Sequence, residues 1–273
     1  MKIIQVGAGS GGMPVLDLVC RDPRVTAVTL IEPDVFKPHN VVRHLFGAQG
    51  VGEAKADLAA TWLRERCPQL EVRTINGDLL DPGLAEDIQK EASGAKMGIC
   101  AADNEPAKFA WDALMRRSGL AWTLGEVLSG GIGGFVHWFR PGGACYGCVA
   151  SFLQRTVAAP SSGQPDYSQP GGPVQETAIP ASAASIHTFA ALHAQITLDF
   201  LADPASYNPG FTSLLFTLQK VPGMFEEAFR PYRFTIPRAD DCLICASTVP
   251  AASTSMEELD VELDRALTRL GHA

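Results

Sequence analysis

Short apolar runs alternate with longer segments of mixed character over the first 125 residues. Each run has the length of a buried strand, and the runs occupy residues 2–6, 25–31, 70–75, 96–101 and 120–124. The segments between them predict helices. The first helix begins at Pro14, and the others cover residues 52–66, 82–91 and 106–117. Strands that alternate with helices in this way predict a Rossmann-like parallel sheet with helices packed on it.

The pattern changes in the second half of the chain. Residues 135–140 alternate between apolar and polar side chains, which is typical of an antiparallel strand, and residues 211–218 and 232–236 predict paired strands. We therefore expect an α/β fold in which a Rossmann-like sheet, parallel in its N-terminal half, is continued by antiparallel strands.

The region between these strands holds a helix and a long connection. Residues 183–201 predict a mostly buried helix, and we interpret its His187 and His193 as packing or hydrogen-bonded residues, because no spaced partner accompanies either. Residues 157–182 are rich in Ala, Pro, Gly and Ser and show no apolar period. They form either a passive linker or a loop that closes over something.

A glycine motif follows the first strand directly. Gly7, Gly9 and Gly12 form G-x-G-x-x-G, and the second strand ends at Glu32, twenty residues after the third glycine. Such glycines let the backbone approach a phosphate at a helix N-terminus, and the acidic residue accepts the ribose hydroxyls. The motif indicates a nucleotide but no particular reaction. The alternative is a glycine turn that only packs a helix tightly on the sheet.

Two C-x-x-C pairs lie about ninety residues apart. Cys145 and Cys148 form one tight turn and Cys242 and Cys245 the other, each next to a predicted antiparallel strand. One pair alone would be ambiguous with a redox motif. Two pairs favour a tetrahedral four-sulfur zinc site, which has no open position and is therefore assigned a structural role.

Length and composition are those of a globular protein. The chain has 273 residues, of which 46% are hydrophobic and 19% charged. We expect a single domain over residues 1–273, with a nucleotide-binding half at 1–125. Residues 126–273 would hold the antiparallel strands, the cysteine pairs, a crossover loop at about 150–182, and a closing helix at 256–270.

The charge and the apolar pattern exclude several function classes. The formal net charge is −8, which argues against a surface that tracks nucleic-acid phosphates and is compatible with a partner that has a basic face or tail. No run of eighteen apolar residues exists, so we expect no membrane span. The chain begins in a strand rather than a signal segment, and we expect a cytoplasmic location with its cysteines as thiols or metal ligands.

Several further motifs occur in a fixed order around the glycine loop. Together they resemble the ThiF/MoeB/E1 superfamily of ATP-dependent activators of ubiquitin-like and sulfur-carrier proteins. The matching stretches are Gly7-Ala8-Gly9-Ser10-Gly11-Gly12-Met13-Pro14, Glu32-Pro33-Asp34 at the usual Asp-x-Asp, Asn40-Val41-Val42-Arg43, Gly52-Glu53-Ala54-Lys55-Ala56, Asp103-Asn104, and the two cysteine pairs.

The resemblance implies adenylation of the C-terminal carboxylate of a β-grasp carrier protein that ends in Gly-Gly, with ATP and Mg²⁺ consumed and pyrophosphate released. It also implies a structural zinc ion, a homodimer, and a downstream acceptor that is E2-like or a sulfur donor. The roles that it implies are Gly7, Gly9, Gly11 and Gly12 as the phosphate loop, Glu32 at the ribose, Asn40, Arg43 and Lys55 at the phosphates, and Asp103 at Mg²⁺, with Arg43, Lys55 and Asp103 catalytic.

The sequence departs from the family pattern in three places. Residues 149–190 contain no cysteine, so we expect adenylation without a thioester or persulfide. The other cysteines, Cys20, Cys67 and Cys100, are expected in the core. Many relatives carry an arginine on a helix before the first strand, and we expect it to be absent or supplied elsewhere. His44 replaces the common Gln after Arg43.

Two other functions are compatible with parts of this pattern. An NAD-dependent oxidoreductase would use the glycines and Glu32 but would leave Asn40, Arg43, Lys55 and the cysteine pairs without a role. A catalytically weak activator could instead bind a carrier tail or form half of a heterodimer. The retained phosphate-contacting residue types argue against that alternative.

Overall fold

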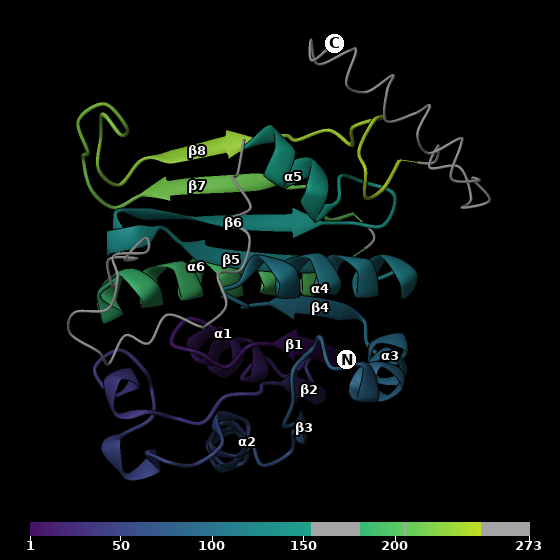
Figure 1. Ribbon diagram of the computed structural model, residues 1–273, viewed down its shortest axis with the longest axis vertical. Coiled ribbons are helices and arrows are strands. Elements are labelled where there is room, and N and C mark those ends of the chain that lie inside the picture. The colour runs from purple at the N-terminus through teal and green to yellow at the C-terminus, as the bar shows by residue number, and fades with distance from the viewer. Residues whose placement is uncertain (154–180, 205, 247–273) are drawn as a thin grey trace, which may run out of the picture.

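A single eight-stranded sheet runs through the protein (Figure 1). The computed structural model describes residues 1–153, 181–204 and 206–246. The strands follow the order β3-β2-β1-β4-β5-β6-β7-β8, with parallel pairing from β3 to β5 and antiparallel pairing from β5 to β8. Their bounds are Lys2–Val6 (β1), Ala27–Ile31 (β2), Glu71–Ile75 (β3), Met97–Cys100 (β4), Trp122–Val127 (β5), Gly133–Phe139 (β6), Ser213–Thr217 (β7) and Pro231–Phe234 (β8).

Helices cover both faces of this sheet. α1, α2 and α6 contribute to one apolar core, and α3, α4 and α5 contribute to the other. Neighbouring strand residues alternate between the two, so that Ile3 joins the first core and Ile4 the second. The helices span Gly12–Cys20 (α1), Lys55–Arg66 (α2), Ala85–Ser93 (α3), Glu105–Arg117 (α4), Tyr146–Phe152 (α5) and Ala183–Ala202 (α6), with 3₁₀ turns at Pro38–Asn40, Ala48–Gly50, Pro82–Leu84 and Ser129–Gly131.

The predicted fold class is confirmed. Each predicted strand is present, although β5 extends to Val127, three residues beyond its predicted end. The tight turn expected at Cys145 and Cys148 is wrong, because Cys145 is the N-cap of α5, a helix that the sequence did not predict. Seven residues are too few to display a helical period. Most of the predicted crossover loop and the whole predicted helix at 256–270 lie outside the described residues. None of the helices in the described ranges is long and apolar enough to cross a bilayer.

α6 is joined to the sheet by a small buried polar cluster. His193 Nε2 lies 2.8 Å from Thr123 Oγ1, which lies 2.9 Å from Thr197 Oγ1. Burial lowers the pKa of His193 to about 3, so the ring is neutral. The interpretation of His193 as a hydrogen-bonded packing residue is therefore confirmed.

The long segment between β2 and α2 packs through a cluster of aromatic side chains. Phe36 is fully buried, and its ring centroid lies 5.1 Å from that of His44 and 5.6 Å from that of Phe46. Phe46 in turn lies 6.1 Å from Trp62 of α2. This aromatic cluster fixes the segment on α2 and brings it back toward the glycine loop.

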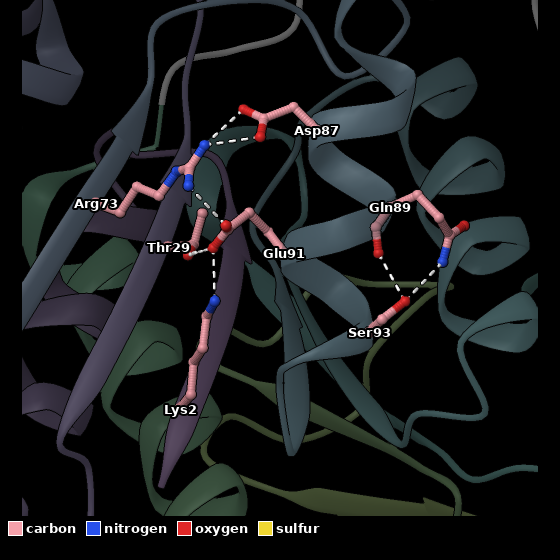
Figure 2. Close-up of polar contacts among 7 residues, drawn as sticks. All are labelled: Lys2, Thr29, Arg73, Asp87, Gln89, Glu91 and Ser93. Carbon is pink, nitrogen blue, oxygen red and sulfur yellow. Dashed lines mark hydrogen bonds and ion pairs between the residues drawn. The ribbon is translucent and has the colours of Figure 1, made fainter.

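Glu91 of α3 ties three parallel strands together (Figure 2). Its carboxylate accepts hydrogen bonds from Lys2 Nζ on β1 and Thr29 Oγ1 on β2, both at 2.6 Å. Its other oxygen lies 2.8 Å from Arg73 Nη1 on β3, and Arg73 also pairs with Asp87 at 2.7 Å. Burial alone would raise the pKa of Glu91, but the hydrogen bonds from Lys2 and Thr29 outweigh it and hold the pKa below the usual 4.5.

Replacing Glu91 by Gln should lower the free energy of unfolding by about 1–2 kcal/mol at pH 7, because Lys2 and Arg73 lose a buried acceptor but can still reach water. A carboxyl group with a lower pKa in the folded chain stabilises the fold above its unfolded pKa, and this contribution is lost as the pH falls through the folded value. In urea unfolding curves the wild type and Glu91→Gln should therefore converge as the pH drops below 4.5.

The matched control is Asp87→Asn, since the Asp87 side chain is 42% exposed and its ion pair should contribute under about 1 kcal/mol. An equal loss of stability in the two variants would contradict the role assigned to Glu91.

Candidate functional site

The glycine loop is shaped by close backbone packing at two of its glycines. Gly7 has φ +91°, and a Cβ there would lie 2.6 Å from the carbonyl oxygen of Ala101 at the end of β4. A Cβ at Gly12 would lie 2.3 Å from the carbonyl oxygen of Gly7. The close packing therefore requires glycine at both positions. This is the packing role that the alternative interpretation assigned to all the glycines of the motif.

The other two glycines face open space. No protein atom lies within 4 Å of a Cβ placed on Gly9, and only Ile186 Cγ2, at 3.8 Å, approaches one placed on Gly11. Within the described ranges, the N–H groups of Gly9, Ser10 and Gly11 donate to no protein acceptor. These donors precede α1, where the helix dipole favours negative charge. The loop is therefore able to cradle an anion such as a phosphate.

Glu32 lies against the same loop rather than free in a cavity. One carboxylate oxygen accepts the N–H of Ala8, and the other accepts the N–H of Asp34 at 2.9 Å. Burial raises the pKa of Glu32, and the charge of Lys55 and these hydrogen bonds partly offset that effect. Each carboxylate oxygen keeps a second lone pair, so the geometry leaves acceptor capacity for a ribose hydroxyl.

The three other polar residues predicted from the segment after β2 have different surroundings. Lys55, at the start of α2, is buried and lies 2.6 Å from Asp34 Oδ2. Asn40 is also buried, and its Oδ1 accepts the N–H of Lys37 at 2.9 Å, which stabilises the local 3₁₀ turn. Arg43 is half-buried, and its side chain has no hydrogen bond or ion pair within the part of the chain that the structure describes.

His44 joins this segment to the glycine loop. Its Nδ1 accepts the N–H of Phe46 at 3.3 Å, which leaves Nε2 to donate to the carbonyl oxygen of Ala8 at 2.9 Å. Burial lowers the pKa of His44 to about 4, and the charges of Lys55 and Arg43 contribute to the shift. His44 is therefore a neutral ring that supports the loop, a position that the sequence marked only as a departure from Gln.

Asp103 and Asn104 follow β4 beside the glycine loop. Asn104 caps α4, because its Oδ1 accepts the N–H of Ala107 at 2.9 Å. Asp103 is exposed and has no hydrogen bond or ion pair to any other described residue. It lies two positions after Ala101, whose carbonyl oxygen contacts the loop at Gly7. A free carboxylate at this place could take part in binding a hard cation such as Mg²⁺.

The fold thus brings the predicted residues to one edge of the sheet, where β1, β2 and β4 end (Figure 1). The groups at this edge are N–H donors, a guanidinium and a carboxylate that have no partner among the described residues, together with a lysine, and this set suits a metal-bound polyphosphate. A separate hollow, lined in part by Lys96, Trp138 and Tyr207, includes none of these residues.

A buried ionic cluster beside α4 was not predicted. Lys108 Nζ lies 2.8 Å from Glu105 Oε1 and 2.6 Å from Glu126 Oε1, and Tyr146 donates to Glu105 at 2.7 Å. His137 Nε2 lies 3.0 Å from the second oxygen of Glu126. Burial alone would lower the pKa of Lys108, but the charge of Glu126 outweighs it and raises the pKa, so the ammonium stays charged. The spacing of Glu105 and Lys108 on a helix was the only sequence signal for this cluster.

The four cysteines of the two C-x-x-C pairs converge. Their sulfur atoms all lie within 4.8 Å of one another, and the Sγ–Sγ distances are 3.8 Å for Cys145–Cys148, 3.6 Å for Cys145–Cys242 and 3.5 Å for Cys148–Cys245. Tetrahedral zinc with Zn–S bonds of about 2.3 Å places sulfur atoms about 3.8 Å apart. The cluster could therefore hold a zinc ion.

Backbone groups complete the surroundings of this cluster. The N–H of Ala239 donates to Cys148 Sγ at 3.4 Å. Burial alone would raise the pKa of Cys242, but the N–H groups of Ile244 and Cys245 outweigh it and lower the pKa to about 7. A Cβ at Gly147 would lie 2.7 Å from Ile244 Cγ1, so this glycine lets the two pairs approach.

Sequence comparisons agree with this architecture. A model of the ThiF family matches residues 1–242. The NEDD8-activating enzyme E1 catalytic subunit of Saccharomyces cerevisiae is 30% identical over 161 residues, which are 56% of this chain and 52% of that protein. The chain thus spans about half the length of the curated relative that it matches.

Solved structures with the same fold include those of MccB. The crystal structure of E. coli MccB has a TM-score of 0.65 and 18% identity, and the match covers 93% of this chain and 67% of MccB. E. coli MccB with ATP has a TM-score of 0.60 and 17% identity, and the match covers 90% of this chain and 66% of MccB. The Microcin C7 biosynthetic enzyme MccB in complex with N-formylated MccA has a TM-score of 0.62 and 17% identity, and the match covers 90% of this chain and 67% of that one. At these identities the matches establish the fold.

The family model extends from the first residue through Cys242, so it includes the glycine loop, every residue of the candidate site and three of the four clustered cysteines. On the strength of that match and of the shared fold, the chain belongs to the ThiF family.

Proposed function

We propose that this protein is an E1-like adenylyltransferase, which uses ATP and Mg²⁺ to activate the C-terminal carboxylate of a β-grasp carrier protein ending in Gly-Gly. The observation that carries the proposal is the set of N–H donors on Gly9, Ser10 and Gly11, which are unused among the described residues, on a loop that His44 joins to the segment of Arg43. Membership of the ThiF family, the NEDD8-activating relative and the MccB structure with ATP support the same reaction class.

In the proposed reaction the carrier carboxylate attacks the α-phosphate of ATP and pyrophosphate leaves. Gly9 and Gly11 offer backbone donors to the phosphates, and Arg43 and Lys55 neutralise charge that builds up there. Arg43 forms a planar fork that matches two oxygens, whereas Lys55 acts as a point charge that breaks or shares its pair with Asp34. Asn40 contacts the phosphates through its amide, and Glu32 orients the ribose. Asp103 would hold Mg²⁺, which would supply positive charge to the phosphates.

The absence of cysteine between residues 149 and 190 supports a reaction that stops at the acyl-adenylate. The activated tail then passes to a downstream acceptor, which is E2-like or a sulfur donor. We also propose that the protein acts as a homodimer in the cytoplasm, in line with the resemblance and with the location expected from the sequence. MccB in complex with N-formylated MccA offers a precedent within this fold for engaging a second molecule, and the carrier tail takes that role here.

Arg43→Ala and Asp103→Ala should each lower carrier-dependent ATP–pyrophosphate exchange about 10²-fold, because each removes a charge that stabilises the transition state. Exchange is measured with radiolabelled pyrophosphate and a β-grasp protein ending in Gly-Gly.

The matched control is Arg64→Ala, which removes an exposed arginine of α2 that donates only to the carbonyl oxygen of Val72. A carrier that lacks its last two glycines should support no exchange. Full exchange in Arg43→Ala and Asp103→Ala would remove the roles assigned to them.

ATP with Mg²⁺ should raise the melting temperature by about 5–10 °C at a hundredfold excess over the dissociation constant, because ligand bound only to the native state stabilises it by about 2.7 kcal/mol. NAD⁺ and NADH at the same concentration as ATP should leave the melting temperature unchanged. A shift with NAD(H) and none with ATP would favour the oxidoreductase alternative. A shift with ATP but no exchange with any carrier would favour the catalytically weak activator.

We also propose that Cys145, Cys148, Cys242 and Cys245 bind one structural zinc ion. All four ligand positions would be occupied by sulfur, so the ion would have no open position for chemistry. It would link the start of α5 to the turn after β8 and so stabilise the antiparallel half of the sheet.

Purified protein should contain one zinc atom per chain by mass spectrometry, and Cys145→Ser should lower both the metal content and the melting temperature, because a structural zinc ion contributes folding free energy. Cys67→Ser is the control, since Cys67 is buried outside the cluster. Unchelated wild-type protein without zinc would contradict the proposal.

A further inference from the structure

The first turn of α6 packs against the glycine loop. Ile186 Cγ2 would lie 3.8 Å from a Cβ on Gly11, and Ser185 Oγ would lie 2.7 Å from a Cβ on Gly131 in the turn before β6. Ser182 caps this end of the helix by accepting the N–H of Ser185 at 3.1 Å. An element from the second half of the chain therefore borders the site that the first half builds.

His187 lies on this turn and is unlike the other buried histidines. The residue as a whole is half-buried, but its Nε2 atom is buried and has no hydrogen-bond partner among the described residues. His44, His137 and His193 each have at least one partner for a ring nitrogen, at 2.8–3.3 Å. An unsatisfied buried polar atom costs about 1–3 kcal/mol, and such atoms are few in native proteins. On the exposed side of the helix this nitrogen would bind water. Its buried position therefore requires a partner that the described residues do not supply.

His187 also lies close to a group of positive charges. Burial is the main cause of the low pKa of His44, the charges of Lys55 and Arg43 lower it further, and His187 lies near enough to act on the same ring. These groups come from α6, from the segment after β2 and from the start of α2, and they surround a histidine that donates to the glycine loop. Like charges brought together repel each other unless an anion lies among them. The partner that His187 lacks is thus expected to be anionic.

We propose that His187 is a nucleotide-binding residue whose Nε2–H donates to a phosphate oxygen of bound ATP. This inference rests on the proposed function and deepens it, because it adds α6 to the elements that grip the polyphosphate. None of the motifs that identify the family includes this position. The role also differs from the packing role that the sequence suggested for His187, and it agrees with the contact of the neighbouring Ile186 with Gly11.

The test compares ATP·Mg²⁺ with adenosine, which lacks phosphates, by isothermal titration calorimetry on the full chain. His187→Phe keeps a flat ring without a donor and should weaken ATP·Mg²⁺ binding about tenfold, the effect of losing one hydrogen bond to a charged group. Its affinity for adenosine should be unchanged. His187→Gln keeps an N–H donor near the position of Nε2 and should bind ATP·Mg²⁺ within about threefold of the wild type. Thr188→Ala, at the exposed neighbour on α6, is the control and should bind both ligands normally.

A second measurement applies even if His187→Phe does not fold. In the wild type, the ¹⁵N signal of His187 Nε2, assigned by its loss in His187→Gln, should shift with ATP·Mg²⁺ and not with adenosine. The proposal is overturned if His187→Phe binds ATP·Mg²⁺ normally while Arg43→Ala does not, or if His187→Phe loses both ligands equally. If the wild type fails to bind ATP·Mg²⁺, the proposed function falls together with this inference.

Discussion

The backbone contact between the end of β1 and the end of β4 is the constraint on which the site depends. Val6 accepts the N–H of Ala101 at 2.9 Å, and the next residue, Gly7, turns so closely over Ala101 that no side chain fits between them. Gly7 also donates to Ile31 at 2.9 Å, so the loop is held between β2 and β4. Because the chain must turn at this point, α1 begins over the sheet edge, with Glu32 on one side and Asp103 on the other.

Cationic and acidic side chains meet at this edge. The chain carries a net charge of −8, and Arg43 and Lys55 lie at the same edge as Glu32, Asp34 and Asp103. Lys55 has a carboxylate partner in Asp34, whereas the Arg43 guanidinium has none among the described residues. Burial keeps His44 neutral, so it supports the loop without adding to the repulsion between Lys55 and Arg43. This mixture of cations and carboxylates suits a small metal-bound polyphosphate better than an extended polyanion.

The antiparallel half of the sheet supports this edge through α5 and α4. Tyr146 donates its backbone N–H to Asp112 at 3.0 Å and its hydroxyl to Glu105 at 2.7 Å, so α5 is bound to the start and to the middle of α4. Asn104 caps the same helix, and Asp103 precedes it. The residue before Tyr146 is Cys145, a member of the four-sulfur cluster. A metal ion there would stabilise α5, and through α4 it would limit the motion of Asp103.

The sequence by itself determined the order of strands and helices, the fold class and the positions of the glycine loop and cysteine pairs, because periodicity and ordered motifs are local properties of the chain. The tertiary structure decided which groups meet. It placed the Glu32 carboxylate on backbone donors and paired Lys55 with Asp34. Among the described residues it left the side chains of Arg43 and Asp103 and the buried Nε2 of His187 without partners. Contacts between residues twenty or more positions apart leave no local pattern in the sequence, so only the packed chain reveals them.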